Sequence, residues 1–435
     1  MLPMCPTVVV FIVALARPDR YHRFMSKTST GLIHHPYAPP AGFVAPQPGV
    51  FKASTVIFPN VAALRSRDWK HKDGYTYGLH GTPTTFLLEE RIATLEGGKH
   101  CVLVPSGLAA IANVNLALLS SGDEVLLPDN VYGPNKALAE GELKNWGITH
   151  QLYDPMDPAD LQARIGPRTR LVWLEAPGSV TLEFVPLAHL AQICRARGVT
   201  TALDNTWGAG LAFNGFDLGR GERTAAGNGA DIVVHALTKY PSGGGDVLMG
   251  SIVTRDDGLH LKLKLAHMRL GFGVGANDAE AVLRSLPSLA LRYRAHDSAA
   301  RALAGWLSNR AEVAQLLHPA FEGSPGHAHW KALCTGGDAG DEGLAAGLFS
   351  VVFHERYSPA QVDAFCDALR LFKLGYSWGG PVSLVVPYDI ASMRSRQLAT
   401  WKHKGVLVRF SIGLEAVSDL RADLEQALQA LAAHR

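Results

Sequence analysis

From about residue 84 onward, short apolar runs alternate with stretches that have helical spacing, and few architectures accommodate this alternation. TTFLLEERIATLE (84–96) and LAHLAQICRARG (187–198) predict helices, the second of which ends at a glycine. The predicted strands are CVLV (101–104), EVLL (124–127), LVWL (171–174), TTALD (200–204) and DIVVHAL (231–237). Because strands alternate with helices, we predict an α/β fold with a large, mainly parallel sheet covered on both faces.

A second unit is predicted after about residue 280. Residues 281–310 predict a long helical connector, which Pro287 must kink or cap. The apolar runs that predict a small sheet are GLFSVVF (347–353), SLVVP (383–387) and VLVRFSI (406–412). We therefore predict an N-terminal extension and arm at 1–80, a large α/β domain at 81–280 and a smaller C-terminal α/β domain at 281–435.

Composition narrows the possible partners and the compartment. The formal net charge of the 435 residues is only +2, which argues against a nucleic-acid partner. The five cysteines are scattered and form no CxxC pair, which argues against a zinc site or a disulfide framework. We expect no metal and a reducing cytoplasm.

The N-terminal region contains the apolar run VVVFIVALA (8–16). No Lys or Arg precedes this run, and it is too short to span a bilayer as a helix. It is either a poor export signal or an untranslated leader to a start at Met25, and we favour Met25 and no membrane partner. Residues 31–60 predict an irregular arm, and the Gly-rich stretch at 219–230 predicts a surface loop.

Polar residues stand at the ends of the predicted strands. They are Asp204, Thr238, Lys239, Tyr132 and the pair Ser106-Gly107, which opens a predicted helix. Ligands of such sheets bind outside the carboxyl ends of the strands, so we expect these groups to converge there.

Their chemistry suits pyridoxal 5′-phosphate (PLP). A partly desolvated Lys239 loses its proton readily and can attack an aldehyde. The Asp204 carboxylate can keep the pyridine nitrogen protonated, so that the ring accepts electrons from Cα. The N–H groups of Gly107 and Leu108 at a helix N-terminus suit the phosphate.

Two further groups complete the set: the Thr238 hydroxyl for the phosphate, and the Tyr132 ring for stacking. Singly, each residue also has a structural explanation as a cap, a turn or a solvated side chain; the hypothesis depends on their co-occurrence. GGG at 243–245 lacks the form of a phosphate loop, and no GxGxxG follows the first strand, which disfavours a nicotinamide site.

At these residues the chain resembles the Cys/Met-metabolism PLP enzymes, which have the aspartate-aminotransferase type fold (fold type I). The matching segments are YGLHGTPTT (77–85), LEGGKHCVLVPSGLAAI (95–111), LEAPGSVTLE (174–183), LDNTWGAG (203–210), ALTKY (236–240), YSWGG (376–380) and VRFSIGLE (408–415). Within that family, LDNTWGAG, YSWGG and APGSVTLE favour the bacterial cystathionine β-lyase branch over the γ-synthase and γ-lyase branches.

The resemblance implies cofactor-binding roles. Lys239 matches the Schiff-base lysine, Asp204 the partner of the pyridine nitrogen, and Tyr132 the ring-stacking tyrosine. The phosphate-binding positions are matched by Gly107, Leu108 and Thr238.

It also implies substrate-binding roles. Arg409 matches the residue that binds the substrate α-carboxylate, and Ser377 and Trp378 match positions on the substrate side. Tyr77 matches a tyrosine that the neighbouring subunit contributes, which implies at least a homodimer and commonly a homotetramer.

The chain departs from the family pattern at two phosphate contacts. Many relatives carry an Arg two residues after the equivalent of Tyr77, and here that position is Leu79, followed by His80 as a weaker substitute. Many relatives also have a Ser two residues before the equivalent of Thr238, and here that position is Ala236.

The implied reaction is β-elimination of L-cystathionine to homocysteine, pyruvate and ammonia, with Lys239, helped by Tyr132 or Tyr77, as general base. The alternatives are γ-elimination or γ-replacement, β-elimination of cysteine or cystine, and a PLP-binding scaffold without turnover.

Overall fold

The computed structural model describes residues 27–37, 42–43, 45–66, 69, 72, 74–219 and 228–433. The apolar run at 8–16, Met25 and most of the Gly-rich stretch at 219–230 lie outside the described residues.

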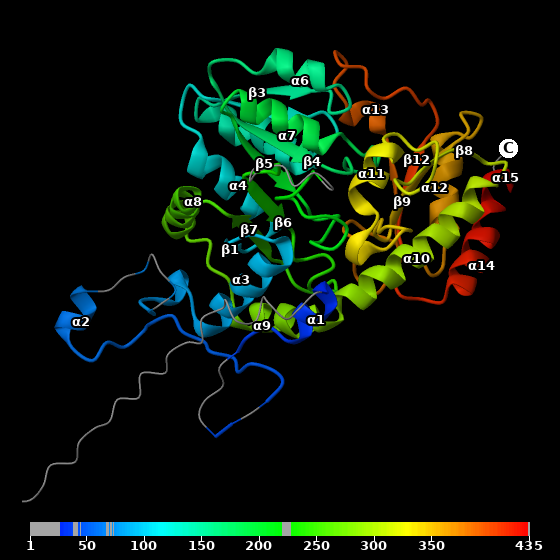
Figure 1. Ribbon diagram of the computed structural model, residues 1–435. Coiled ribbons are helices and arrows are strands. Elements are labelled where there is room, and N and C mark those ends of the chain that lie inside the picture. The colour runs from blue at the N-terminus through cyan, green and yellow to red at the C-terminus, as the bar shows by residue number, and fades with distance from the viewer. Residues whose placement is uncertain are drawn as a thin grey trace, which may run out of the picture.

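A seven-stranded sheet forms the centre of the molecule, in the order β1-β7-β6-β5-β4-β2-β3 (Figure 1). Its strands are β1 (His100–Val104), β2 (Glu124–Pro128), β3 (Thr149–Tyr153), β4 (Thr169–Glu175), β5 (Thr200–Asp204), β6 (Ile232–His235) and β7 (Gly250–Thr254). The neighbours from β3 to β6 pair in parallel, whereas β7 runs antiparallel to β6 and β1. The predicted mainly parallel sheet is confirmed, with β3 and β7 added to the five predicted strands.

Apolar side chains cover both faces of this sheet, which is why its strands read as continuous apolar runs. Leu203 and Val233 pack in one core with residues of α3 (Pro83–Glu96), α7 (Leu187–Ala196) and α9 (Ala276–Ser285). Ala202 and Ile232 point to the opposite face, where they share a second core with residues of α4 (Gly107–Leu118) and α8 (Asp257–Leu270). The side chain of Asp204 has the same parity as Ala202 and therefore belongs to the α4 face.

The helices of this part are α3 (Pro83–Glu96), α4 (Gly107–Leu118), α5 (Gly133–Leu138), the π-helix η3 (Ala139–Leu143), α6 (Pro158–Arg164), α7 (Leu187–Ala196) and α8 (Asp257–Leu270). The predicted helices at 84–96 and 187–198 are confirmed by α3 and α7. Gly97 caps α3 in the left-handed region, at φ 76°.

The predicted connector is confirmed as α9 (Ala276–Ser285) and α10 (Leu289–Ser308). Between them lies the 3₁₀ turn η4 (Leu286–Ser288), which contains Pro287. Proline lacks the N–H that an uninterrupted α-helix needs there, so the turn separates the two helices.

A five-stranded sheet follows, in the order β10-β11-β12-β9-β8. Its strands are β8 (Val313–Leu317), β9 (Leu348–Phe353), β10 (Lys373–Leu374), β11 (Leu384–Tyr388) and β12 (Leu407–Ser411). The accompanying helices are α11 (His327–Cys334), η5 (Gly337–Ala339), α12 (Pro359–Ala368), α13 (Ile390–Met393), α14 (Val417–Leu428) and α15 (Ala430–Ala433). In Figure 1, α12 and α14 lie beside this sheet, away from the large one. The helix α10 also reaches the small sheet, but its first turns pack in the core of the large sheet through Leu289 and Tyr293.

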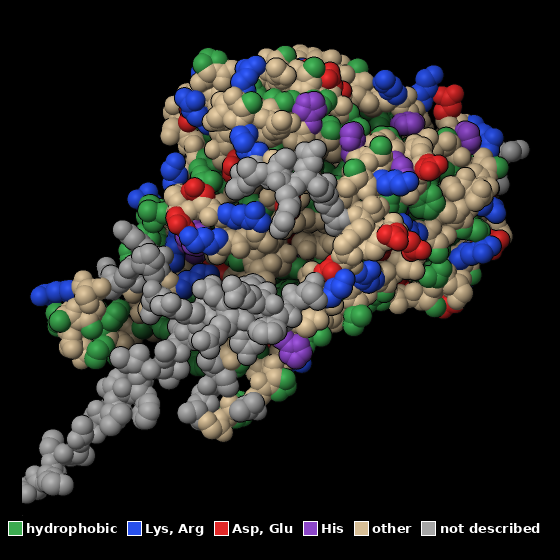
Figure 2. Space-filling view, in the orientation of Figure 1, with side chains coloured by type: hydrophobic (Ala, Val, Ile, Leu, Met, Phe, Trp, Pro, Cys, Tyr) green, Lys and Arg blue, Asp and Glu red, His purple; other side chains and the backbone are tan. Residues whose placement is uncertain are grey.

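The N-terminal arm contains α1 (Thr28–Ile33), α2 (Val61–Arg65) and the 3₁₀ turn η2 (Gly78–His80). Figure 1 shows α2 standing away from the body of the molecule. Apolar side chains gather over it in Figure 2, and Ile57, Val61 and Leu64 are 85%, 58% and 45% exposed. Within the described part of the chain, no helix combines the length and the apolar character needed to cross a membrane.

Candidate active site

A cavity of about 440 Å³ opens at the carboxyl ends of β4, β5 and β6. Nine of the ten predicted site residues line it: Gly107, Leu108, Tyr132, Asp204, Thr238, Lys239, Ser377, Trp378 and Arg409. The tenth, Tyr77, does not. Strand ends of the large sheet and segments around the small sheet therefore meet at one place. The strand ends alone predicted that the groups of the large sheet converge, and the family resemblance implied the residues around the small sheet.

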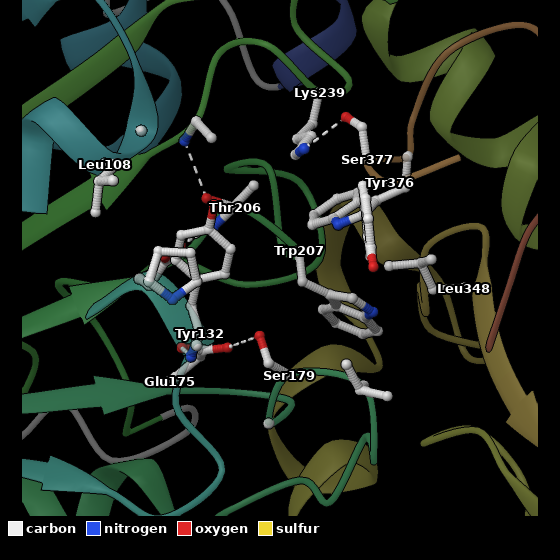
Figure 3. A pocket seen from close by; sticks show the side chains of 18 of the residues that line it. Leu108, Tyr132, Glu175, Ser179, Thr206, Trp207, Lys239, Leu348, Tyr376 and Ser377 are labelled. Carbon is white, nitrogen blue, oxygen red and sulfur yellow. Dashed lines mark hydrogen bonds between the residues drawn. The ribbon is translucent and has the colours of Figure 1, made fainter. Parts of the chain in front are cut away.

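Lys239 lies in the turn after β6, and its amine donates a hydrogen bond to the Ser377 hydroxyl at 2.6 Å. Figure 3 shows the two side chains pointing toward each other. The amine is also 5.3 Å from the centre of the Trp378 ring. Burial, with the nearby Arg409 charge, lowers the pKa of Lys239 to about 8. A lysine in this state is a far better nucleophile near neutral pH than a solvated one.

Two carboxyl groups stand side by side at the ends of β4 and β5, since Glu175 pairs with Asp204 in the parallel register. The Thr206 N–H donates to Asp204 Oδ1 at 3.0 Å. Burial raises the pKa of Asp204, and the Thr206 hydrogen bonds oppose this shift. Burial and then the Asp204 charge also raise the pKa of Glu175. A cationic group placed against Asp204 would relieve the desolvation of this carboxylate.

The N-terminus of α4 forms one wall of the cavity. The Ser106 hydroxyl accepts a hydrogen bond from the Ala109 N–H at 3.0 Å, which confirms the predicted cap. The first N–H groups of a helix have no partner within it and attract anions. A Cβ on Gly107 would lie 2.6 Å from that of Ala236, so only glycine lets the two backbones approach this closely.

The turn that carries Thr238 is tied to the start of β7. The Thr238 hydroxyl donates to the Met249 carbonyl at 3.2 Å and accepts from its N–H at 3.0 Å. The Ala236 N–H donates to the Thr206 hydroxyl at 2.9 Å. Because the Thr238 hydroxyl donates its proton to the Met249 carbonyl, it does not donate to an anion in this geometry. The donors that remain for an anion here are mainly backbone N–H groups.

Tyr132 precedes α5, and its N–H donates to Glu175 Oε2 at 2.8 Å. Tyr132 is 40% exposed and lines the cavity. The second Glu175 oxygen accepts from the Ser179 hydroxyl at 2.7 Å. Glu175 therefore fixes the backbone that presents the Tyr132 ring to the cavity.

Arg409 lies on β12 and is 8% exposed. Its Nη2 donates to the Ser377 carbonyl at 3.2 Å, and its guanidinium lies 5.5 Å from the centre of the Tyr388 ring. Its Nε is buried without a hydrogen-bond partner among the described residues. A buried guanidinium with a vacant donor is suited to a carboxylate ligand.

Backbone strain is concentrated around the cavity. Val180, Leu182 and Ser377 line it and have φ of 71°, 58° and 87°. Non-glycine residues rarely adopt positive φ, and a β-branched valine does so least readily. Such strain is typical of binding and catalytic sites, where surrounding structure maintains it.

Tyr77 lies in the arm, where it forms an isolated bridge with Thr55 and is 46% exposed. Leu79 and His80 follow in η2, and the imidazole of His80 bonds the Thr76 hydroxyl at 2.7 Å. Contribution of Tyr77 to a neighbouring subunit stays a prediction.

The sequence reasoning assigned no role to several lining residues: Glu175, Ser179, Thr206, Trp207, Tyr376 and Tyr388. Glu175 had a signal, because like Asp204 it is a carboxylate directly after a buried apolar run. The others follow no such rule and are identified only by their place in the fold.

These groups fit PLP. A lysine with a lowered pKa, a strand-end carboxylate and a glycine-lined helix N-terminus face one cavity beside a buried arginine. They match the aldehyde, the pyridine nitrogen, the phosphate and an amino-acid carboxylate in turn.

Comparison with known proteins supports this reading. The family model described as Cys/Met metabolism PLP-dependent enzyme matches residues 29–429. A cystathionine β-lyase of Bordetella avium is 37% identical over 399 residues, which cover 90% of this chain and 94% of that protein. An L-alanine/L-glutamate racemase of Wolbachia pipientis is 32% identical over 394 residues, covering 88% and 92%. The crystal structure of a cystathionine γ-synthase from Xanthomonas oryzae pv. oryzae in complex with cystathionine matches with a TM-score of 0.81 at 30% identity, over 94% of this chain and 99% of that one.

The relatives carry names of different reactions, while the family, the cofactor and the fold agree. The resemblance inferred from the motifs and the predicted PLP-dependent transferase fold are thereby confirmed. This chain belongs to the Cys/Met metabolism family of PLP-dependent enzymes.

Proposed function

We propose that this chain is a cystathionine β-lyase, which cleaves L-cystathionine to homocysteine, pyruvate and ammonia. The observation that carries the proposal is the meeting of Lys239, Asp204 and Arg409 in one cavity. The cystathionine β-lyase of Bordetella avium and the β-lyase-like segments LDNTWGAG, YSWGG and APGSVTLE favour β-elimination.

When bound, PLP supplies an electron sink for negative charge at the substrate Cα. Lys239 would hold the cofactor through its amine, and the freed amine would take the substrate Cα proton and later give a proton to the departing sulfur. The lowered pKa of Lys239 suits it to both transfers near neutral pH, and Tyr132, or Tyr77 of a neighbouring subunit, assists.

Asp204 would keep the pyridine nitrogen protonated, and Tyr132 would stack on the ring. The backbone N–H groups of Gly107 and Leu108 would hold the phosphate, together with Thr238. Because these donors are neutral and Leu79 stands where many relatives have an arginine, we propose that the PLP phosphate is bound more weakly here than in relatives that carry this arginine.

Arg409 binds the substrate α-carboxylate, where a planar guanidinium and a planar anion match. Ser377 and Trp378 lie on the substrate side of Lys239 and orient the Cα–H bond toward its amine. The substrate is a small sulfur amino acid.

We propose an arm at 1–80, a PLP-binding domain at 81–280 and a C-terminal domain at 281–435. The exposed apolar side chains of Ile57, Val61 and Leu64 favour burial against a second copy, in at least a dimer and commonly a homotetramer. The absence of a CxxC pair favours the cytoplasm.

The experiment is a keto-acid and thiol assay of the PLP-loaded protein with cystathionine, cystine and cysteine. Pyruvate with homocysteine supports β-elimination, whereas 2-oxobutyrate indicates γ-elimination. A Lys239→Ala protein that still released pyruvate at the parent rate would refute the role of Lys239. Cofactor binding without any product would indicate a scaffold.

A further inference from the structure

Next to the cavity lies a buried polar cluster whose residues are not among those that line it. The Glu96 carboxylate accepts from Asn205 Nδ2 at 2.8 Å and bonds His235 Nδ1 at 2.7 Å. All three residues are 0% exposed. They come from three elements: the end of α3, the residue after β5 and the end of β6. We call these three residues the Glu96 cluster.

A buried carboxylate at the end of a helix is unfavourable for the stability of the fold. Glu96 is the last residue of α3, where a negative charge opposes the helix dipole. Burial removes the carboxylate from water, and an apolar residue is often no worse for stability at such a position. His235 Nε2 and Asn205 Oδ1 also lack hydrogen-bond partners among the described residues. A cluster this costly suggests a role beyond stability, because proteins break local rules mostly at functional sites.

The position of the cluster indicates that role. Asn205 directly follows Asp204, and its N–H extends the ladder by donating to the Val234 carbonyl at 2.9 Å. His235 begins the turn that leads to Lys239, whose N–H donates to the Ala236 carbonyl at 3.0 Å. The Glu96 carboxylate therefore joins, through two hydrogen bonds, the residue that follows Asp204 to the residue from which the chain turns toward Lys239.

The cluster acts from the far side of the sheet. Asp204 pairs with Val234, so these two side chains share the face that carries the cavity. Asn205 and His235, one residue further along each strand, point to the opposite face, toward α3.

We propose that Glu96 is a positioning residue for the cofactor: through His235 and Asn205 it fixes the spacing between Asp204 and Lys239 that PLP requires. This rests on the proposed roles of Asp204 and Lys239. Glu96 itself touches neither cofactor nor substrate.

The test measures the PLP dissociation constant of the apoprotein by fluorescence titration. Glu96→Gln keeps the shape of the side chain but places its amide NH₂ against one of the two donors, Asn205 Nδ2 or His235 Nδ1. His235→Ala removes the second of these donors. Each substitution should weaken PLP binding by about tenfold or more. His235→Asn, which places an amide nitrogen near the position of Nδ1, should restore most of the affinity. The long-wavelength absorbance of the bound cofactor should change its pH dependence in Glu96→Gln and His235→Ala.

Asp423→Asn is the matched control, because this buried carboxylate of α14 accepts from the N–H groups of Arg370 and Leu371, far from the cavity. It should lower the melting temperature and leave PLP affinity unchanged within about twofold.

Unchanged PLP affinity in Glu96→Gln and His235→Ala overturns the proposal, as does an equal loss in Asp423→Asn. If Glu96→Gln does not fold, the comparison of His235→Ala with His235→Asn decides. The titration needs no substrate, so a protein that binds PLP but releases no pyruvate contradicts the proposed function alone.

Discussion

The Lys239 amine and the Ser377 hydroxyl lie 2.6 Å apart, although 138 residues separate them in the sequence. The bond joins the turn after β6 of the large sheet to the segment that precedes β11 of the small sheet. Ser377 reaches this place with φ of 87°. A strained residue that holds the proposed catalytic lysine indicates that the two sheets jointly define where the amine lies.

Ser377→Ala removes this hydrogen bond. A hydrogen bond to a charged group contributes on the order of 1.5 kcal/mol, so kcat/KM for cystathionine should fall about tenfold. Steady-state kinetics with a melting curve as control provide the measurement. Parent kinetics in a folded Ser377→Ala protein would mean that the bond does not orient Lys239 during turnover.

The pH dependence of cofactor uptake should report the lowered pKa of Lys239. Only the neutral amine attacks an aldehyde, so the rate of recombination of apoprotein with PLP should rise with pH and level off above the pKa of about 8. Arg409→Met removes the second cause of the shift, so its profile should move to higher pH. A parent profile that keeps rising to the ordinary lysine range would contradict a desolvated Lys239.

Arg409→Lys tests the carboxylate contact. A lysine keeps the charge but loses the planar pair of donors, so KM for cystathionine should rise by about a hundredfold. The PLP dissociation constant, measured in parallel, should change little. If KM is unchanged while PLP binding weakens, Arg409 serves the cofactor and not the substrate.

Leu79→Arg tests whether the missing arginine weakens binding of the PLP phosphate. If the arm reaches the phosphate of a neighbouring subunit, a restored arginine should tighten PLP binding about tenfold at low salt and less at high salt. Leu79→Gln, similar in size but neutral, should have little effect. Equal affinity in parent and Leu79→Arg would place η2 away from the phosphate.

Much of the architecture could be predicted from the sequence because buried parallel strands read as apolar runs. The runs at β2, β4, β5 and β6 are of this kind. The run at β1 is also apolar and buried, although β1 pairs antiparallel with β7. The strand β3 was not predicted because it lies at the edge of the sheet, and its sequence THQLY is too polar to form an apolar run. The strand β7 was not predicted because GSIVT begins with a glycine and a serine; the glycine packs here against the Ser106 carbonyl.

The sequence could predict those residues of the candidate site that directly follow a strand of the large sheet. Asp204 and Lys239 do so, and both line the cavity. Tyr376 and Tyr388 come from around the small sheet, and only the packing of the two sheets brings them to the cavity. Glu96 ends a helix with an ordinary pattern, so its two buried partners are visible only in three dimensions.

The central claim is that Lys239 holds PLP covalently, and borohydride reduction of the loaded protein followed by peptide mass spectrometry tests it most directly. Reduction converts a lysine–PLP linkage into a stable adduct. The account predicts the adduct mass on the peptide that contains Lys239, and no such mass in Lys239→Ala. An adduct on another lysine of the parent protein, or none after loading with PLP, would contradict it.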